Sequence, residues 1–245
     1  MTETAEKIGA RLAACGLACA PELPERLAVY LRLLTEWNAK MDLTAVTEEA
    51  EAVDRHLVDS LMPLAFPALR EAFTAKDASV IDVGTGAGFP GLALAMALPD
   101  TRFKLLDAQR KRLDFLAAVM AETGVKNVEL IHLRAEDGAR QPALRERFQI
   151  AVARAVAPLP VLAEYLLPYV KPEGMALCWK GPALREELER GARAAHILGG
   201  RVGEIIPAPI PGRDWEHLLL PIRKVKPTPK AYPRRSGTPG REPLG

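Results

Sequence analysis

Cysteine is scarce in this sequence of 245 residues, which contains only three: Cys15, Cys19 and Cys178. So small and odd a number argues against a disulfide framework, and the spacing matches no set of metal ligands. Cys15 and Cys19 are four residues apart on an expected helix, where small packing residues explain them better than a metal site. Cys178 lies inside an apolar strand and is interpreted as a core residue. We therefore predict no bound metal.

Long apolar runs and a secretory signal are also missing. The apolar stretches are far shorter than the roughly 20 residues that cross a bilayer. The N-terminus carries Glu3, Glu6 and Arg11 instead of a basic region followed by an apolar one. We expect a cytoplasmic, monomeric protein without a membrane partner.

Net charge is only +2, but it is unevenly distributed. Residues 223–245 hold seven basic residues and one acid, a net charge of +6, which leaves −4 for residues 1–222. Five prolines exclude helix and inner strand from this tail. A disordered solubilising tail is one interpretation. A basic arm that lies along a polyanion is the other, and a nucleotide site upstream favours RNA.

The chain divides into three parts. Apolar residues at helical spacing predict helices over 22–39, 48–60 and 63–73, which form an N-terminal helical cap over residues 1–75. Residues 76–223 then alternate between strands and helices, and residues 224–245 form the arm. The length and the 49% hydrophobic content suit one large domain with an extension.

The alternation predicts an α/β fold with a doubly wound, mostly parallel seven-stranded sheet. Two final strands without an intervening helix predict an antiparallel pair. The expected strands are 79–83, 102–107, 127–133, 149–154, 175–180, 201–207 and 216–223, and the expected helices are 88–98, 109–123, 139–146, 158–170 and 182–198.

A glycine-rich loop constrains the chemistry most. Residues 81–91 read Ile-Asp-Val-Gly-Thr-Gly-Ala-Gly-Phe-Pro-Gly, between a strand and a helix, and Asp107 ends the next strand. Glycines let backbone approach a ligand, a helix N-terminus offers free N–H groups, and a carboxylate can accept ribose hydroxyls. This pattern predicts a nucleotide-like cofactor.

Three features favour S-adenosylmethionine over a dinucleotide. Asp82 would repel a pyrophosphate but suits an ammonium and a sulfonium group. Too few residues follow the fifth strand for a separate substrate domain of usual size. The closing antiparallel pair also replaces the last unit of a dinucleotide fold.

Several further motifs narrow the prediction to one family. The chain resembles the bacterial small-subunit methyltransferase G family, also called glucose-inhibited division protein B, within the class I S-adenosylmethionine-dependent methyltransferases with a Rossmann-like fold. The motifs that carry this resemblance are Trp37-Asn38, Leu43-Thr44, His56-x-x-Asp59-Ser60, Asp82–Gly91, Arg154-Ala155, Lys180-Gly181 and the tail Pro229-Lys-Ala-Tyr-Pro-Arg-Arg-x-Gly-x-Pro.

The resemblance implies methyl transfer to N7 of a guanine in 16S rRNA or the small ribosomal subunit, at position 527 in the 530 loop. Guanine N7 carries a lone pair and no proton, so the attack needs no general base and depends on positioning and desolvation. The sequence also lacks the Asn/Asp-Pro-Pro-aromatic motif that exocyclic-amine methylation would favour. A methyltransferase for a small molecule or protein, and a non-catalytic RNA-binding or assembly factor, remain alternatives.

For the cofactor we predict contacts from the glycine loop, from the ends of the next two strands and from Arg154. Asp107 is the strongest candidate, because charge-assisted bonds to ribose contribute about 1.5–3 kcal/mol each. Glu136 is an adenine contact only through the resemblance; otherwise it is a solvated loop acid. The predicted cofactor residues are Asp82, Gly84, Gly86, Gly88, Phe89, Asp107, Ala108, Gln109, Ala135, Glu136 and Arg154.

For the acceptor base we predict positioning by Arg154, His56 and Asp59. Arg154 could hold the cofactor carboxylate or an RNA phosphate, or form a structural ion pair. His56 and Asp59 share a helical face, where an interhelical hydrogen bond is the plainer interpretation. Deleting residues 224–245 is expected to weaken RNA binding and spare cofactor affinity. The predicted RNA contacts are Arg134, Lys180, Arg223, Lys224, Lys226, Lys230, Arg234 and Arg235.

Overall fold

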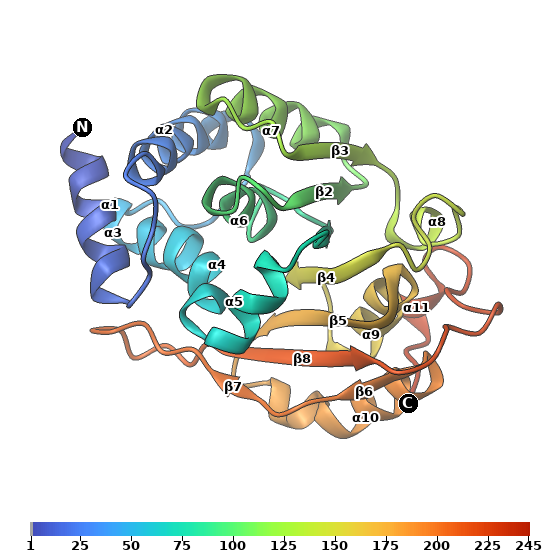
Figure 1. The fold of residues 1–245 in the computed structure, drawn as a ribbon. Helices are drawn as coiled ribbons and strands as arrows, with labels where there is room; N and C mark the ends of the chain where they lie inside the picture. The colour runs from blue at the N-terminus through green and yellow to red at the C-terminus, as the bar shows by residue number, and fades with distance from the viewer. Residues whose placement is uncertain (1) are drawn as a thin grey trace.

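A computed structural model describes residues 2–245. The protein has one central sheet between two layers of helices (Figure 1). Strand order is β3-β2-β1-β4-β5-β8-β6, with the short β7 paired to β8. The strands are β1 (Ser79–Val83), β2 (Arg102–Asp107), β3 (Val128–His132), β4 (Phe148–Arg154), β5 (Val170–Lys180), β6 (Gly200–Val202), β7 (Ile206–Pro207) and β8 (Leu218–Lys224).

The predicted parallel sheet with an antiparallel closing strand is confirmed. Strands β1 to β5 pair in parallel, whereas β8 runs antiparallel to β5, β6 and β7. The strand expected over 201–207 is divided into β6 and β7. In register, Val83 at the end of β1 lies opposite Leu106 in β2, which brings the glycine loop beside Asp107. In α/β folds with a parallel sheet, ligands usually bind at the carboxyl ends of the strands, which is where the glycine loop and Asp107 lie.

The N-terminal cap consists of short and long helices packed on one face of the sheet. Leu27, Tyr30, Leu31 and Leu34 of α2 follow helical spacing and are buried, so one side of this helix faces the core. The predicted helix over 48–60 is interrupted by a π-helical stretch. The cap elements are α1 (Glu3–Ala14), α2 (Leu23–Met41), α3 (Glu49–Ala52), the π-helical Val53–Val58, α4 (Asp59–Leu61), the 3-10 turn Met62–Ala65 and α5 (Pro67–Thr74).

One expectation about this cap is wrong. Helix α1 ends at Ala14 because Cys15 already has non-helical backbone and Gly16 takes a φ of +71°. Cys19 is exposed beyond that turn, so Cys15 and Cys19 do not share a helical face.

The core helices cover both faces of the sheet, because alternate strand residues enter two apolar clusters. Val80, Leu105 and Val152 pack with the cap, α6 and α7, whereas Ile81, Leu106 and Ala151 pack with α9 and α10. The predicted helix over 139–146 is absent; α8 precedes it, and turns follow. These helices are α6 (Gly91–Ala97), α7 (Arg110–Thr123), α8 (Ala135–Gly138), α9 (Leu159–Leu166), α10 (Leu184–Ile197) and α11 (Thr238–Arg241).

The C-terminal arm does not extend away from the domain, and it contains a short helix, α11, which the prolines were expected to exclude; Pro239 is tolerated because it lies in the first turn. In Figure 1 it continues from β8 and lies beside α8 and α9, at the end of the molecule opposite α1. Tyr232 and Leu244 pack against the apolar cluster under α9 and α10. No helix within residues 2–245 is long and apolar enough to cross a membrane.

Candidate active site

The glycine loop after β1 is held by backbone bonds to β2. The amides of Gly84 and Thr85 both donate to the carbonyl oxygen of Leu106, at 2.8 and 3.0 Å. Gly84, Gly86 and Gly88 all have positive φ, of +76°, +58° and +91°. Because L side chains rarely adopt such values, this turn depends on glycine.

Two of these glycines serve different purposes. A Cβ on Gly86 would meet no atom nearer than 4.0 Å, so this residue leaves open space beside the loop. A Cβ on Gly88 would lie 2.3 Å from the hydroxyl of Tyr30, which itself donates to the carbonyl of Ala87. Gly88 is therefore needed for packing against the cap, and only Gly86 lies beside open space.

Asp107 at the end of β2 connects the glycine loop to the next helix. Its Oδ2 accepts the amide of Gly86 at 2.9 Å, and its Oδ1 accepts the amide of Gln109 at 2.8 Å. The guanidinium of Arg112 lies 3.5 Å from Oδ2. Each carboxylate oxygen has further lone pairs, so Asp107 can accept ligand hydroxyls while it shapes the loop.

A pocket of about 330 Å³ lies over these strand ends. Its size is in the range of small-molecule sites, and two carboxylates, from Asp107 and Glu136, face it. Most predicted cofactor residues line it. The lining residues are Val83, Gly84, Leu106, Asp107, Ala108, Gln109, Arg112, Leu133, Arg134, Ala135, Glu136, Ala155, Val156, Tyr165 and Gly237.

Asp82, Gly86, Gly88, Phe89 and Arg154 do not line this pocket, although all five were predicted to contact the cofactor. Asp82 is completely buried, and its Oδ2 accepts the Thr85 hydroxyl at 2.7 Å and the Gly91 amide at 2.9 Å. Burial raises its pKa to about 6. Among the described residues, its Oδ1 has no hydrogen-bond partner. Phe89 is stacked between Tyr30 and His56, with both ring centroids 4.8 Å away.

A second pocket, of about 460 Å³, adjoins the first, and both are lined by Ala155. At its base Asp59 accepts Arg154 Nη1 at 2.7 Å and pairs with His217 Nδ1 at 2.6 Å. Arg154 also donates to the carbonyl of Arg55. Burial acts to raise the pKa of Asp59, but His217 and Arg154 outweigh it and hold the pKa below its ordinary value.

His56 lies near this group but does not bond to Asp59. Its Nε2 lies 2.8 Å from the Thr44 hydroxyl, and within residues 2–245 its Nδ1 has no partner. Burial, with the nearby charge of Arg154, lowers the pKa of His56 to about 4. Its imidazole is therefore neutral at pH 7.

The loop before β8 carries two aromatic residues into the second pocket. Trp215 packs on the Arg55 guanidinium, 3.9 Å from the ring centroid, and stacks on His217 at 5.8 Å. Neither residue was predicted from the sequence. A tryptophan and a histidine two apart in a loop rich in proline and glycine could have drawn attention, but nothing local connects them to Asp59.

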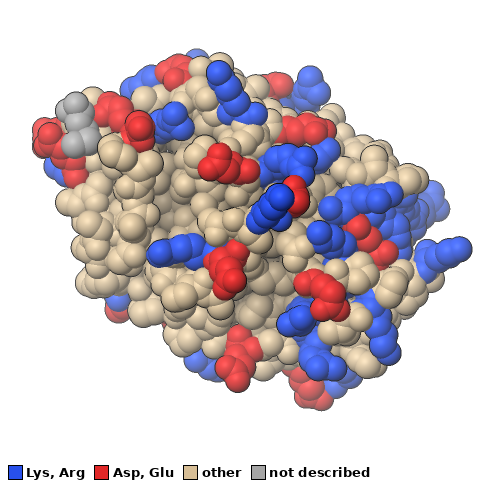
Figure 2. All heavy atoms as spheres, in the orientation of Figure 1, with Lys and Arg blue, Asp and Glu red and all other residues tan. Residues whose placement is uncertain are grey.

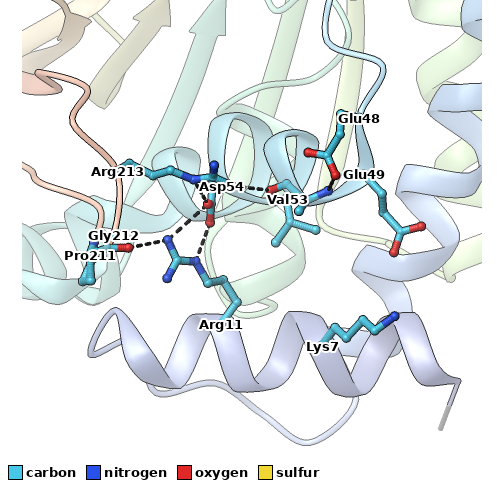
Figure 3. A pocket seen from close by; sticks show the side chains of 10 residues that line it. Lys7, Arg11, Glu48, Glu49, Val53, Asp54, Pro211, Gly212 and Arg213 are labelled. Carbon is cyan, nitrogen blue, oxygen red and sulfur yellow. Dashed lines mark hydrogen bonds and ion pairs between the residues drawn. The ribbon is translucent and has the colours of Figure 1, made fainter.

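A buried carboxylate ties the same loop to the cap. Figure 3 shows Arg11 and Arg213 pointing toward Asp54 from α1 and from the loop. Both guanidinium Nε atoms lie 2.6 Å from Asp54, which is 2% exposed, and Arg11 also donates to the Pro211 carbonyl at 2.6 Å. Breaking so buried a pair by removing one partner is costly, so Asp54 fixes the loop.

The predicted RNA contacts occupy different environments. Lys224 is fully buried, donates to the Leu167 carbonyl at 2.6 Å and pairs with Glu146 at 3.1 Å. Burial lowers its pKa to about 8. Lys224 therefore does not reach solvent, and the structure contradicts its predicted contact with phosphate.

Three more of these basic residues have acidic partners. Lys180 lies 2.6 Å from Glu187 and is largely covered, and exposed Arg223 lies 3.1 Å from Glu173. Arg234 pairs with buried Glu164 at 2.7 Å. Arg134, Lys226, Lys230 and Arg235 are exposed. Figure 2 shows Lys and Arg gathered over the end of the molecule where α8 and the arm lie.

Neither metal nor cysteine chemistry is evident at these sites. Within residues 2–245, His, Cys, Asp and Glu form no group of three or more that could hold a metal ion. Cys178 is fully buried, and burial raises its pKa to about 12, so its thiol does not ionise at neutral pH.

Comparison with known proteins settles the family. The GidB family pattern, described as rRNA small subunit methyltransferase G, matches residues 24–208. The chain belongs to this family. A Clostridium botulinum protein named Ribosomal RNA small subunit methyltransferase G is 44% identical over 229 residues, covering 94% of each chain. Another of that name, from Alkaliphilus metalliredigens, is 44% identical over 220 residues, covering 90% of each. The resemblance predicted from the motifs is confirmed.

Solved structures confirm the fold alone. A variant of the 16S rRNA (adenine(1408)-N(1))-methyltransferase from Catenulisporales acidiphilia, with cosubstrate SAM, aligns at a TM-score of 0.51. The alignment covers 65% of this chain and 91% of that one, at 18% identity. A putative transferase from Pyrococcus horikoshii also aligns at 0.51, with 17% identity, over 67% and 64% of the two chains. The predicted methyltransferase-type α/β fold is thus confirmed.

Proposed function

We propose that this protein transfers a methyl group from S-adenosylmethionine to N7 of a guanine in 16S rRNA. The observation that carries the proposal is the pair of adjoining pockets at the carboxyl ends of β1, β2 and β4. One has a glycine loop and two carboxylates, the other has an aromatic and cationic lining, and Ala155 borders both. Family membership supports rRNA as the substrate, and the family resemblance points to position 527 in the 530 loop.

The residues of the first pocket fit S-adenosylmethionine. Asp107 would accept the ribose hydroxyls, since it already fixes the loop through Gly86 and the helix start through Gln109. Gly84, Ala108, Ala135 and Glu136 line the pocket together with Asp107. Gly86 leaves open space beside the loop, which would let the cofactor approach the backbone.

The second pocket fits the guanine. The bound cofactor supplies an electrophilic methyl group, and the N7 lone pair needs no proton removed. The protein must therefore hold the base in line and exclude water. Asp59 keeps Arg154 and His217 in fixed positions, and Trp215 offers an aromatic wall for a base. His56 stacks on the Phe89 ring and so packs beside the group that Asp59 holds together.

The test measures transfer of a labelled methyl group from S-adenosylmethionine to three substrates: 16S rRNA, assembly intermediates and small subunits that lack the modification. The modified base is then mapped by N7-directed strand cleavage. Label in one guanine of 16S rRNA supports the proposal. Tight cofactor binding without methylation of any of these substrates would instead favour an RNA-binding or assembly factor, and label in a small molecule or protein would refute the rRNA assignment. Monomeric state and cytoplasmic location stay predictions.

A further inference from the structure

The C-terminal arm is anchored to the domain along its length. Thr228 donates its amide to Glu146 Oε1 at 2.7 Å and its hydroxyl to the Leu198 carbonyl at 3.0 Å. Arg145 Nη1 donates to the carbonyl of Tyr232 at 2.8 Å. These bonds come from separate parts of the core, so the path of residues 225–233 is fixed.

A buried ion pair holds the next residue. Arg234 donates its amide to Glu164 Oε1 at 2.7 Å, and its guanidinium donates to both carboxylate oxygens at 2.7–3.1 Å. Glu164 on α9 has no exposed surface, and the Arg234 side chain is 23% exposed. A bidentate arginine with a buried carboxylate fixes direction as well as distance.

Beyond this clamp the arm reaches the cofactor pocket. The Gly237 amide donates to Glu136 Oε1 at 2.7 Å, and the Ser236 hydroxyl donates to Asp137 at 2.8 Å. Gly237 itself lines the pocket, next to Tyr165 of α9. Glu136 is 4% exposed, and Gly237 provides its only hydrogen-bond donor within residues 2–245.

We infer that the arm is a wall of the cofactor pocket, in which Arg234 anchors the chain so that Gly237 orients the Glu136 carboxylate toward the adenine of S-adenosylmethionine. This inference rests on the proposed cofactor. One oxygen of Glu136 is taken by the Gly237 amide, which leaves the other to accept from an exocyclic amine. A carboxylate held at one oxygen loses less freedom when it binds such a donor. Glu136 and Gly237 are positioning residues of the pocket.

The experiment measures binding of S-adenosylhomocysteine, and of its analogue with hypoxanthine in place of adenine, to the full-length protein by calorimetry. Hypoxanthine has an oxygen where adenine carries the amine, so a fixed carboxylate rejects it. Wild-type protein should prefer the adenine ligand by about tenfold, the worth of one charged hydrogen bond. Arg234→Ala should weaken the adenine ligand about tenfold and reduce the preference to about twofold.

Arg241→Ala is the matched control, because Arg241 is an exposed arginine of the same arm. It should bind both ligands like wild type. If Arg234→Ala folds and also keeps wild-type affinity and preference, the inference is wrong, although the proposed function stands. If wild-type protein binds neither ligand, the proposed function itself fails.

If Arg234→Ala does not fold, a second pair of variants tests the inference. A chain that ends at Ser236 keeps the Arg234–Glu164 pair but lacks the Gly237 amide, whereas a chain that ends at Arg241 keeps both. Loss of the adenine preference in the shorter chain alone supports the inference. Equal preference in the two chains overturns it.

Discussion

The two adjoining pockets are built in contrasting ways. The cofactor pocket is shaped mostly by backbone: two amides held by Leu106, a glycine at positive φ, and Asp107 bonded to two further amides. The second pocket is shaped by side chains, with Asp59 between Arg154 and His217, and Trp215 packed on Arg55.

This difference explains how each pocket can be recognised. The glycine loop and Asp107 lie close together in the chain, because a turn and the next strand end are local, whereas the Gly237 amide meets Glu136 from 101 positions away. A site built from ion pairs can recruit residues 95 and 158 positions apart, as Asp59 does. The second pocket also responds differently to mutation, because removing one charge leaves its buried partners without a counter-charge.

The largest effect should come from Asp59→Ala. Without this carboxylate, Arg154 and His217 lose their shared partner, so stability should fall by about 3–5 kcal/mol and methyl transfer by roughly 100-fold. Cofactor affinity of the folded protein should stay within about twofold. Denaturant unfolding, single-turnover methylation and calorimetry check the three quantities.

Asp214→Asn is the control, because Asp214 is exposed in the loop that carries His217. It should leave all three quantities near wild type. A large loss of cofactor affinity in Asp59→Ala would show that the two pockets work as one site.

Acid should destabilise the folded protein through His56. Its pKa is about 4 in the folded protein and near 6.5 when unfolded. Between these values the unfolded chain binds the extra proton, so stability rises with pH and is lost as pH falls from 6.5 to 4. Replacement by phenylalanine keeps the stack on Phe89 and should remove about 3 kcal/mol of this acid sensitivity. Parallel pH dependence of unfolding in His56→Phe and wild type would contradict the assignment.

Asp107→Ala should affect the first pocket alone. Loss of its bonds to the loop amides and to ribose should weaken S-adenosylmethionine about tenfold or more. At saturating cofactor the methylation rate should fall only a few-fold. Asp114→Ala, an exposed acid on α7, serves as control. Unchanged affinity in Asp107→Ala, measured by calorimetry, would remove this residue from the cofactor site.

The sequence predicted the first pocket well because its signals are local. A strand, a glycine turn and Asp107 follow one another within 30 residues, and strand alternation fixes which edge they share. The second pocket was predicted only in part. Arg154 and Asp59 were found, but periodicity cannot show that Arg154 turns toward α4 or that His217 meets Asp59.

The arm shows the same limit more sharply. Its basic composition suggested an extended RNA contact, yet Lys224 and Arg234 are paired with core acids, and Gly237 borders the cofactor pocket. Acids such as Glu146 and Glu164 look like ordinary helix or turn residues in the sequence. Only the fold brings them under the arm. Because Gly237 lines the cofactor pocket, the expectation that deleting the arm spares cofactor affinity stays a prediction, which the truncated chains test.

The smallest effect should come from the exposed cations of the arm. Replacing Lys226, Lys230 and Arg235 by glutamine leaves the Arg234 clamp and the Gly237 amide intact, so cofactor affinity should not change. RNA affinity should fall a few-fold, and the slope of log affinity against log salt should decrease by about 2, since each lost phosphate contact removes about 0.7. The matched control replaces Lys76, Arg102 and Lys126 by glutamine. It removes the same charge from exposed positions at the amino ends of β1, β2 and β3. Equal salt slopes for the two triple variants would mean that net charge, and not the arm's position, attracts RNA. A shallower slope for the arm variant alone would separate two functions in one segment: its exposed cations would contact RNA, and its buried residues would complete the cofactor pocket.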